Sequence, residues 1–136
     1  MTARITILIV DDHPIVRQSM RAFLDVQPDL NVIGEAESGA QAVLLARESL
    51  PAVVLMDLTM PGMNGVEATQ ALKQVSPRSQ VIVLTSSYEH DFIKPALQAG
   101  AISYILKDIR SRELAEAIRK AARGEAVLPA HIARSL

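Results

Sequence analysis

Cysteine is absent from this sequence of 136 residues, and its positive and negative charges nearly cancel. Without cysteine the chain has no disulfide bonds, thiolate metal sites or cysteine nucleophiles. A chain that needs no disulfides suits the cytoplasm, and we predict that location. The formal net charge of −1 argues against a nucleic-acid-binding surface, because contacts with a phosphate backbone need a basic face. We therefore predict no direct nucleic-acid binding by this chain.

Long hydrophobic runs are also missing. The apolar segment at residues 5–10 is too short to span a membrane and meets two acids, so we expect neither a membrane segment nor a signal peptide. Apolar residues still make up 49% of the chain, enough for the core of one domain. We find no internal repeat or low-complexity segment. We predict one domain over residues 1–124, and an extension or the start of a linker at 125–136.

Five short apolar segments alternate with helical patterns along the chain. The segments lie at about residues 5–10, 31–36, 52–56, 80–84 and 101–106. The first, third and fourth are nearly continuous apolar runs, which is typical of strands that are buried on both faces of a parallel sheet. The alternation predicts an α/β fold, a doubly wound five-stranded parallel sheet with five flanking helices.

The helical patterns carry recognisable end signals. Five helices are expected. The first begins near Pro14, the second covers about residues 39–48, and the third runs from residue 64 to before residue 77. The fourth covers about residues 89–99 and the fifth about residues 111–123. Ser38, Asn64 and Ser111 are the predicted N-caps, and Gly124 is the predicted stop of the last helix. The fourth pattern contains Pro95, which costs about 3 kcal/mol inside a helix. That helix therefore either starts late or is kinked.

Asp57 closes the third apolar run and is followed by a Pro-Gly turn, which predicts an acid at the carboxyl end of a buried strand. Ligands of open α/β sheets bind in the crevice beyond such strand ends. Asp11 and Asp12 follow the first expected strand, Thr85 follows the fourth, and Lys107 follows the fifth. Taken alone, each has an ordinary explanation as a turn, cap or strand-end residue, but together they predict one site.

Three carboxylates in one cleft would repel each other unless a cation lay between them. Mg²⁺ prefers oxygen ligands and is commonly held by one or two carboxylates together with a phosphate oxygen. Phosphoryl transfer depends on positioning and on charge neutralisation around the phosphoryl oxygens, which Mg²⁺, Lys107 and Thr85 would provide. Asp57 would then be the nucleophile. The pattern predicts Mg²⁺-dependent phosphorylation of Asp57.

Four short motifs surround these residues: Val10-Asp-Asp-His13, Met56-Asp-Leu-Thr-Met-Pro-Gly-Met-Asn-Gly65, Leu84-Thr-Ser86 and Tyr104-Ile-Leu-Lys107. Together they resemble the response-regulator receiver domain of two-component signalling (CheY-like), over roughly residues 4–123. The wording Tyr-Ile-Leu-Lys-Asp108, followed by Glu113-Leu and Ala117-Ile-Arg119, resembles the NarL/FixJ (LuxR-type) subfamily. Within that subfamily it is similar to the VraR/LiaR-like cell-envelope-stress group.

The resemblance implies the flavodoxin-like strand order 2-1-3-4-5, with the site where the first and third strands meet. It implies that Asp57 is the phosphoacceptor and that Asp12 and Asp57 bind Mg²⁺ directly. Asp11 would act through a water molecule, and the backbone carbonyl of Thr59 would be a further ligand. A histidine kinase would be the phosphoryl donor.

The resemblance also implies that Thr85 and Tyr104 form a switch pair, although from the residues alone Tyr104 would be an amphipathic edge residue. Two positions depart from the common receiver pattern. Asp108 stands where many receivers have proline, so we expect no cis-proline peptide there. Ser86 stands where alanine is common. Thr59, Ser86 and Ser87 are therefore candidates for tuning the phosphoryl lifetime, in a direction that the sequence leaves open.

The leading hypothesis is a phosphorylation-controlled switch that forms a homodimer when phosphorylated and catalyses only its own phosphorylation and dephosphorylation. Its output would be a helix-turn-helix transcription regulator, whose DNA-binding part lies outside this chain. The alternatives are an aspartyl-phosphate phosphatase, a flavodoxin-like cofactor binder and a stand-alone interaction module. The phosphatases usually carry a second acid where Thr59 stands. His13, His90 and His131 lack ligand spacing, and we predict cap or surface positions for them rather than a metal role.

Overall fold

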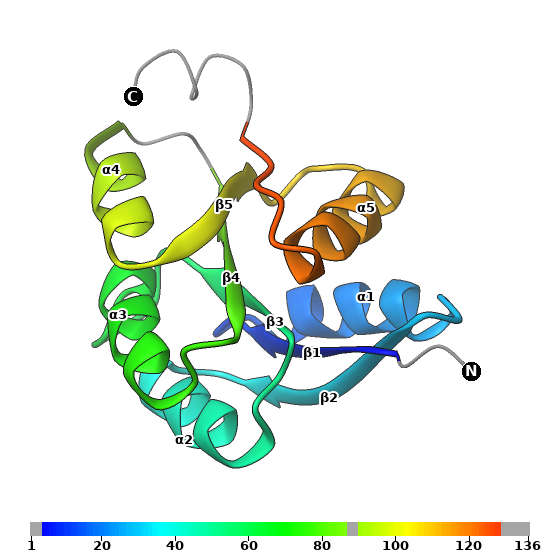
Figure 1. Ribbon diagram of the computed structural model, residues 1–136, viewed down its shortest axis with the longest axis horizontal. Coiled ribbons are helices and arrows are strands. Elements are labelled where there is room, and N and C mark those ends of the chain that lie inside the picture. Colours follow the sequence, from blue (N-terminus) through cyan, green and yellow to red (C-terminus); the bar gives the residue numbers. More distant parts are fainter. Residues whose placement is uncertain (1–3, 87–89, 129–136) are drawn as a thin grey trace.

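A computed structural model describes residues 4–86 and 90–128 of the chain and shows one parallel five-stranded sheet between two layers of helices (Figure 1). The elements are β1 (Ile5–Val10), α1 (Pro14–Asp25), β2 (Leu30–Ala36), α2 (Gly39–Ser49), β3 (Val53–Asp57), α3 (Gly65–Val75), β4 (Gln80–Thr85), α4 (His90–Gln98), β5 (Ala101–Leu106) and α5 (Ser111–Ala122). The strand order is β2-β1-β3-β4-β5. The predicted fold class and strand order are confirmed.

The hydrophobic core is divided between the two faces of the sheet. Successive side chains of a strand point to opposite faces. Ile7 and Ile9 therefore pack with α1 and α5, while Leu8 and Val10 pack with α2, α3 and α4. Figure 1 shows these two helix layers on either side of the sheet. None of the helices within the described ranges has the length and apolar character needed to cross a membrane.

The helix ends show why these segments begin and stop where they do. The Ser38 hydroxyl accepts a hydrogen bond from the backbone N–H of Gln41 at the start of α2 (3.2 Å). At the start of α3, Asn64 and Glu67 each accept a hydrogen bond from the backbone N–H of the other, which forms a capping box. Gly124 follows α5 with a φ of 80°, a conformation that favours glycine. These three predicted end signals are confirmed.

Ser111 was predicted as the N-cap of α5, and that prediction is wrong by one residue. The carbonyl of Arg110 accepts the hydrogen bond from the Leu114 N–H (2.9 Å), so Arg110 is the N-cap and Ser111 is already helical. The backbone of Arg110 is extended and its side chain makes no capping bond. Side-chain preference at the cap therefore did not set this boundary.

Helix α4 begins at His90 and contains Pro95, so the predicted alternative of a late start is wrong. Proline removes one backbone hydrogen bond from the helix. Ile93 and Ala96 on the same helix are buried in the core against the sheet. Their burial offsets the lost bond and keeps the segment helical.

The chain does not leave the domain directly after α5. The backbone N–H of Val127 donates to the hydroxyl of Ser103 on β5 (2.9 Å), and Val127 and Leu128 pack against the core. Residues 129–136 lie outside the described residues. The division of the chain at residue 124 stays a prediction.

Candidate functional site

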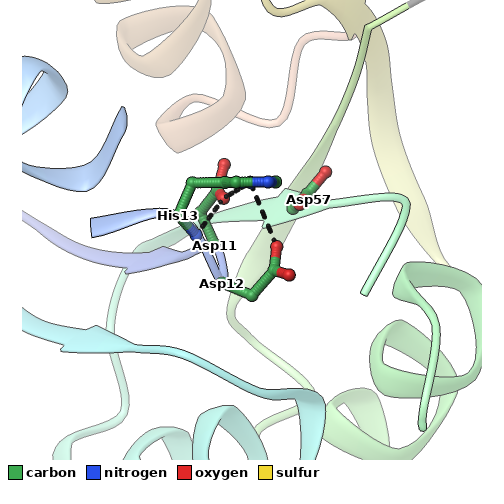
Figure 2. A group of neighbouring side chains, drawn as sticks. All are labelled: Asp11, Asp12, His13 and Asp57. Carbon is green, nitrogen blue, oxygen red and sulfur yellow. Dashed lines mark hydrogen bonds and ion pairs between the residues drawn. The ribbon is translucent and has the colours of Figure 1, made fainter. Parts of the chain in front are cut away.

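Parallel strands end at one edge of the sheet, and four of them place the predicted site residues there. Asp57 is the last residue of β3, Thr85 is the last residue of β4, and Lys107 directly follows β5. Asp11 and Asp12 follow β1, which pairs with β3. Figure 2 shows how Asp11, Asp12 and Asp57 come next to one another. The structure therefore brings together residues that are far apart in the sequence.

The Lys107 ammonium group lies between two buried carboxylates. Its Nζ is 2.9 Å from Oδ1 of Asp57 and 3.0 Å from Oδ2 of Asp11. The side chains of Asp11 and Asp57 are only 1% and 3% exposed, and that of Lys107 is 19% exposed. The backbone N–H of Lys107 donates to the carbonyl of Thr85 (2.7 Å). The pairing of the strand ends therefore fixes the position of the Lys107 backbone.

The surroundings shift the pKa values of the acid and the base. Burial raises the pKa of Asp57 above its ordinary value, and the charge of Asp11 adds to the rise. Lys107 and the Thr59 N–H act in the opposite direction without cancelling it. Burial acts to lower the pKa of Lys107, but its hydrogen bonds and charge attraction with Asp57 and Asp11 outweigh this and the pKa is raised. Lys107 therefore stays charged at neutral pH.

The two oxygens of Asp57 have different environments. Oδ1 accepts hydrogen bonds from Lys107 and, at 3.3 Å, from the backbone N–H of Thr59. Oδ2 is buried and has no hydrogen-bond partner among the described residues. Burying a carboxylate oxygen without a partner is unfavourable. One oxygen of Asp57 is thus held in place while the other is available.

The donor set of this cluster fits a divalent metal ion. Ligand atoms of Asp11, Asp12, His13 and Asp57 all lie within 4.8 Å of one another. The cluster holds three carboxylates, and the Lys107 ammonium group contacts only those of Asp11 and Asp57. Carboxylate oxygens are the ligands that Mg²⁺ prefers. Asp57 Oδ2 is a buried acceptor that such an ion would satisfy.

His13 lies at the predicted kind of position and also contacts the acidic cluster. It is the N-cap of α1 and its side chain is 62% exposed, as a cap or surface histidine would be. Its Nδ1 nevertheless lies 2.9 Å from Oδ1 of Asp11 and 3.2 Å from Oδ1 of Asp12. The signal in the sequence was its position directly after two acids and before a helix-starting proline.

Gly65 allows the start of α3 to lie directly against the end of β3, where Asp57 is located. The Gly65 N–H donates to the Leu58 carbonyl (2.8 Å). A Cβ atom on Gly65 would lie 2.7 Å from the Cα of Leu58 and would clash with the carbonyl oxygen of Asp57. Only glycine allows this approach of α3 to the end of β3.

The remaining predicted residues lie close to this edge. Thr85 is buried, and Ser86 after it is exposed, while Ser87 lies outside the described residues. Tyr104 is fully buried in the core on the side of α4, so reading it from the residues alone as an edge residue was wrong. After Lys107 the loop turns through a hydrogen bond from the Ile109 N–H to the Leu106 carbonyl (3.2 Å).

The response regulator receiver domain is the family whose sequence pattern matches this chain, over residues 7–119. The chain belongs to that family. This receiver is 46% identical to the transcriptional regulatory protein LiaR of Bacillus subtilis over 129 residues, or 95% of the chain and 61% of LiaR. It is 45% identical over 123 residues to the response regulator protein VraR of Staphylococcus aureus, covering 90% of the chain and 59% of VraR.

The solved structures agree with the sequence comparison. The receiver is similar to a two-component response regulator of the LuxR family from Aurantimonas, with a TM-score of 0.89 and 35% identity over 97% of the chain and 94% of that structure. The resemblance to LuxR-type regulators of the VraR/LiaR kind is therefore confirmed, and the phosphatase and stand-alone alternatives are not favoured. The receiver spans about three fifths of the length of LiaR and VraR.

Proposed function

We propose that Asp57 accepts a phosphoryl group from the phosphohistidine of a sensor histidine kinase. The observation that carries the proposal is the asymmetry at Asp57, where Oδ1 is held by Lys107 and Oδ2 is buried without a partner among the described residues. In the transfer an Asp57 oxygen forms a bond to phosphorus as the phosphorus–nitrogen bond of the donor breaks. Asp11, Asp12, Asp57 and the carbonyl of Thr59 would hold Mg²⁺, which supplies charge neutralisation when bound.

The chain's own residues would position and neutralise the phosphoryl group. Lys107 already lies 2.9 Å from Asp57 and would form an ion pair with one phosphoryl oxygen. The Thr85 hydroxyl, at the end of the neighbouring strand, would donate a hydrogen bond to another oxygen. Thr85 and Tyr104 would then act as the switch pair, changing conformation on phosphorylation and altering the protein surface. Thr59 and Ser86 would influence the lifetime of the phosphoryl group.

We further propose that the phosphorylated receiver forms a homodimer and controls a transcription regulator whose DNA-binding part lies outside this chain. The support is the similarity to LiaR and VraR, whose names identify them as a transcriptional regulator and a response regulator. Regulators of this kind act in the cytoplasm, and we propose that location. This receiver would not itself bind DNA, since its net charge is −1.

Phosphorylation by acetyl phosphate with Mg²⁺ tests the assignment of Asp57. Intact mass should rise by one phosphoryl group in the unmodified protein and in Asp108→Asn, and not in Asp57→Asn. Asp108 is an exposed carboxylate near the site and serves as the matched control. Phosphorylation of Asp57→Asn, or none in the unmodified protein, would contradict the proposal. Sedimentation of the same samples with beryllofluoride tests the dimer.

A further inference from the structure

The ring of His13 lies over the acidic cluster although the metal chemistry proposed for this family needs only oxygen ligands. Figure 2 shows His13 next to Asp11 and Asp12, and dashed lines mark its contacts with both carboxylates. A ligand atom of His13 lies within 4.8 Å of a ligand atom of each of the three acids. The cluster therefore offers one nitrogen and three oxygen ligands.

The backbone holds His13 in place. His13 has an extended conformation, with φ −100° and ψ 108°, and Pro14 after it begins α1. The backbone N–H of His13 donates to Oδ1 of Asp11 (2.9 Å), the same oxygen that its Nδ1 contacts. Nδ1 already lies 2.9 Å from Oδ1 of Asp11 and 3.2 Å from Oδ1 of Asp12, so the ring is beside the other ligands before an ion binds.

A second feature of the cluster calls for a cation. Asp57 is buried, and its Oδ2 has no hydrogen-bond partner among the described residues. Lys107 contacts Oδ1 of Asp57 and Oδ2 of Asp11, so it leaves Asp57 Oδ2 unsatisfied. A buried carboxylate oxygen next to other ligand atoms distinguishes this cluster from a group of acids on the protein surface.

The type of ligand decides which ion gains from His13. Mg²⁺ keeps its water ligands and prefers oxygen, so an imidazole adds little to its binding. Zn²⁺ and Co²⁺ bind imidazole and carboxylate ligands together. Their affinity for sites with both nitrogen and oxygen ligands exceeds that of Mn²⁺ and Fe²⁺.

We propose that His13 completes, with Asp11, Asp12 and Asp57, a four-ligand site for a divalent transition-metal ion of the zinc and cobalt class. A metal ion binds an imidazole nitrogen through its lone pair, so Nδ1 would coordinate the ion in its unprotonated form. With four protein ligands, such an ion would have no open position for a phosphoryl oxygen. Such an ion therefore holds the phosphoacceptor and blocks its phosphorylation. This inference rests on the metal site of the proposed function.

Calorimetric titration with Co²⁺ and, separately, with Mg²⁺ tests the proposal on the full chain. His13→Ala should weaken Co²⁺ binding about tenfold or more, with Mg²⁺ affinity changed by less than about threefold. The ligand-field absorption of bound Co²⁺ should also change when the nitrogen ligand is lost. Asp12→Asn should weaken both ions, which places them at one site. Zn²⁺ should inhibit acetyl phosphate labelling less in His13→Ala than in the unmodified protein.

A second histidine provides the control. His131 lies outside the described residues, and His131→Ala should leave Co²⁺ binding unchanged. Unchanged Co²⁺ affinity in His13→Ala overturns the inference, and so does an equal loss for Co²⁺ and Mg²⁺, which would mark a structural role. Absence of Mg²⁺ binding by the unmodified protein would overturn the metal site of the proposed function as well. The exposure of His13 makes loss of folding in this variant unexpected.

Discussion

Replacing Lys107 with methionine keeps the length of the aliphatic side chain and removes the ammonium group between Asp11 and Asp57. The two carboxylates, 1% and 3% exposed, are then left without this counter-charge. Removing one partner of a buried ion pair costs about 3–5 kcal/mol. Because Lys107 is 19% exposed, we expect the lower end, a loss of about 3 kcal/mol in the free energy of unfolding. For a domain of this size that corresponds to a fall in Tm of about 10 °C.

The loss should depend on pH in a defined direction. The pKa of Asp57 is raised in the folded protein, so the folded state binds the proton more strongly than the unfolded state. The contribution of Asp57 to stability is therefore fully present below the unfolded pKa of about 3.9 and is lost as the pH rises through the folded pKa. Lys107 opposes this rise in pKa, and its removal raises it further. The deficit of Lys107→Met should be small near pH 4 and largest at neutral pH.

Urea denaturation without metal ions, followed at several pH values, measures this effect. Lys94→Met is the matched control, because Lys94 is exposed on α4 and its loss should change stability by less than about 0.5 kcal/mol. The double variant Lys107→Met/Asp57→Asn should recover part of the loss. A deficit that matches the Lys94 control, or that is the same at pH 4 and pH 7.5, would refute the electrostatic argument.

Three further predictions concern the same edge of the sheet. Asp57→Asn should raise the free energy of unfolding at neutral pH without metal, and the gain should shrink toward pH 4, since it removes a carboxylate with a raised pKa. Mg²⁺ at 100 times its Kd should stabilise the unmodified protein by about 2.7 kcal/mol and Asp57→Asn much less, as thermal unfolding would show. Gly65→Ala should lower the free energy of unfolding by about 2–3 kcal/mol in urea and weaken Mg²⁺ binding, because its Cβ would meet the backbone of Leu58 and Asp57. Gly34→Ala, where the neighbouring atom belongs to the flexible side chain of Leu8, should cost less; equal losses would contradict this reasoning.

The sequence predicted most of the fold because local patterns and global topology agree. Strands that are apolar throughout belong in a sheet covered on both faces, and the alternation with helices leaves few possible topologies. The differences lie where a local preference competes with packing. Ser111 is a good capping residue, but the Leu114 N–H donates to the carbonyl of Arg110, so α5 is capped one residue earlier. Pro95 stays within α4 because its neighbours are buried.

At the site, the sequence by itself determined which groups are present and that they follow strands. Asp57, Lys107 and the pair Asp11-Asp12 could be named because parallel strands end at one edge. Only the tertiary structure decided how these groups pair. Lys107 contacts one oxygen of Asp57, and the other has no partner within residues 4–86 and 90–128. His13 contacts two acids instead of facing away from them. These contacts depend on distances of a few ångströms between separate strands and loops, which strand order, register and burial set together and no local pattern encodes.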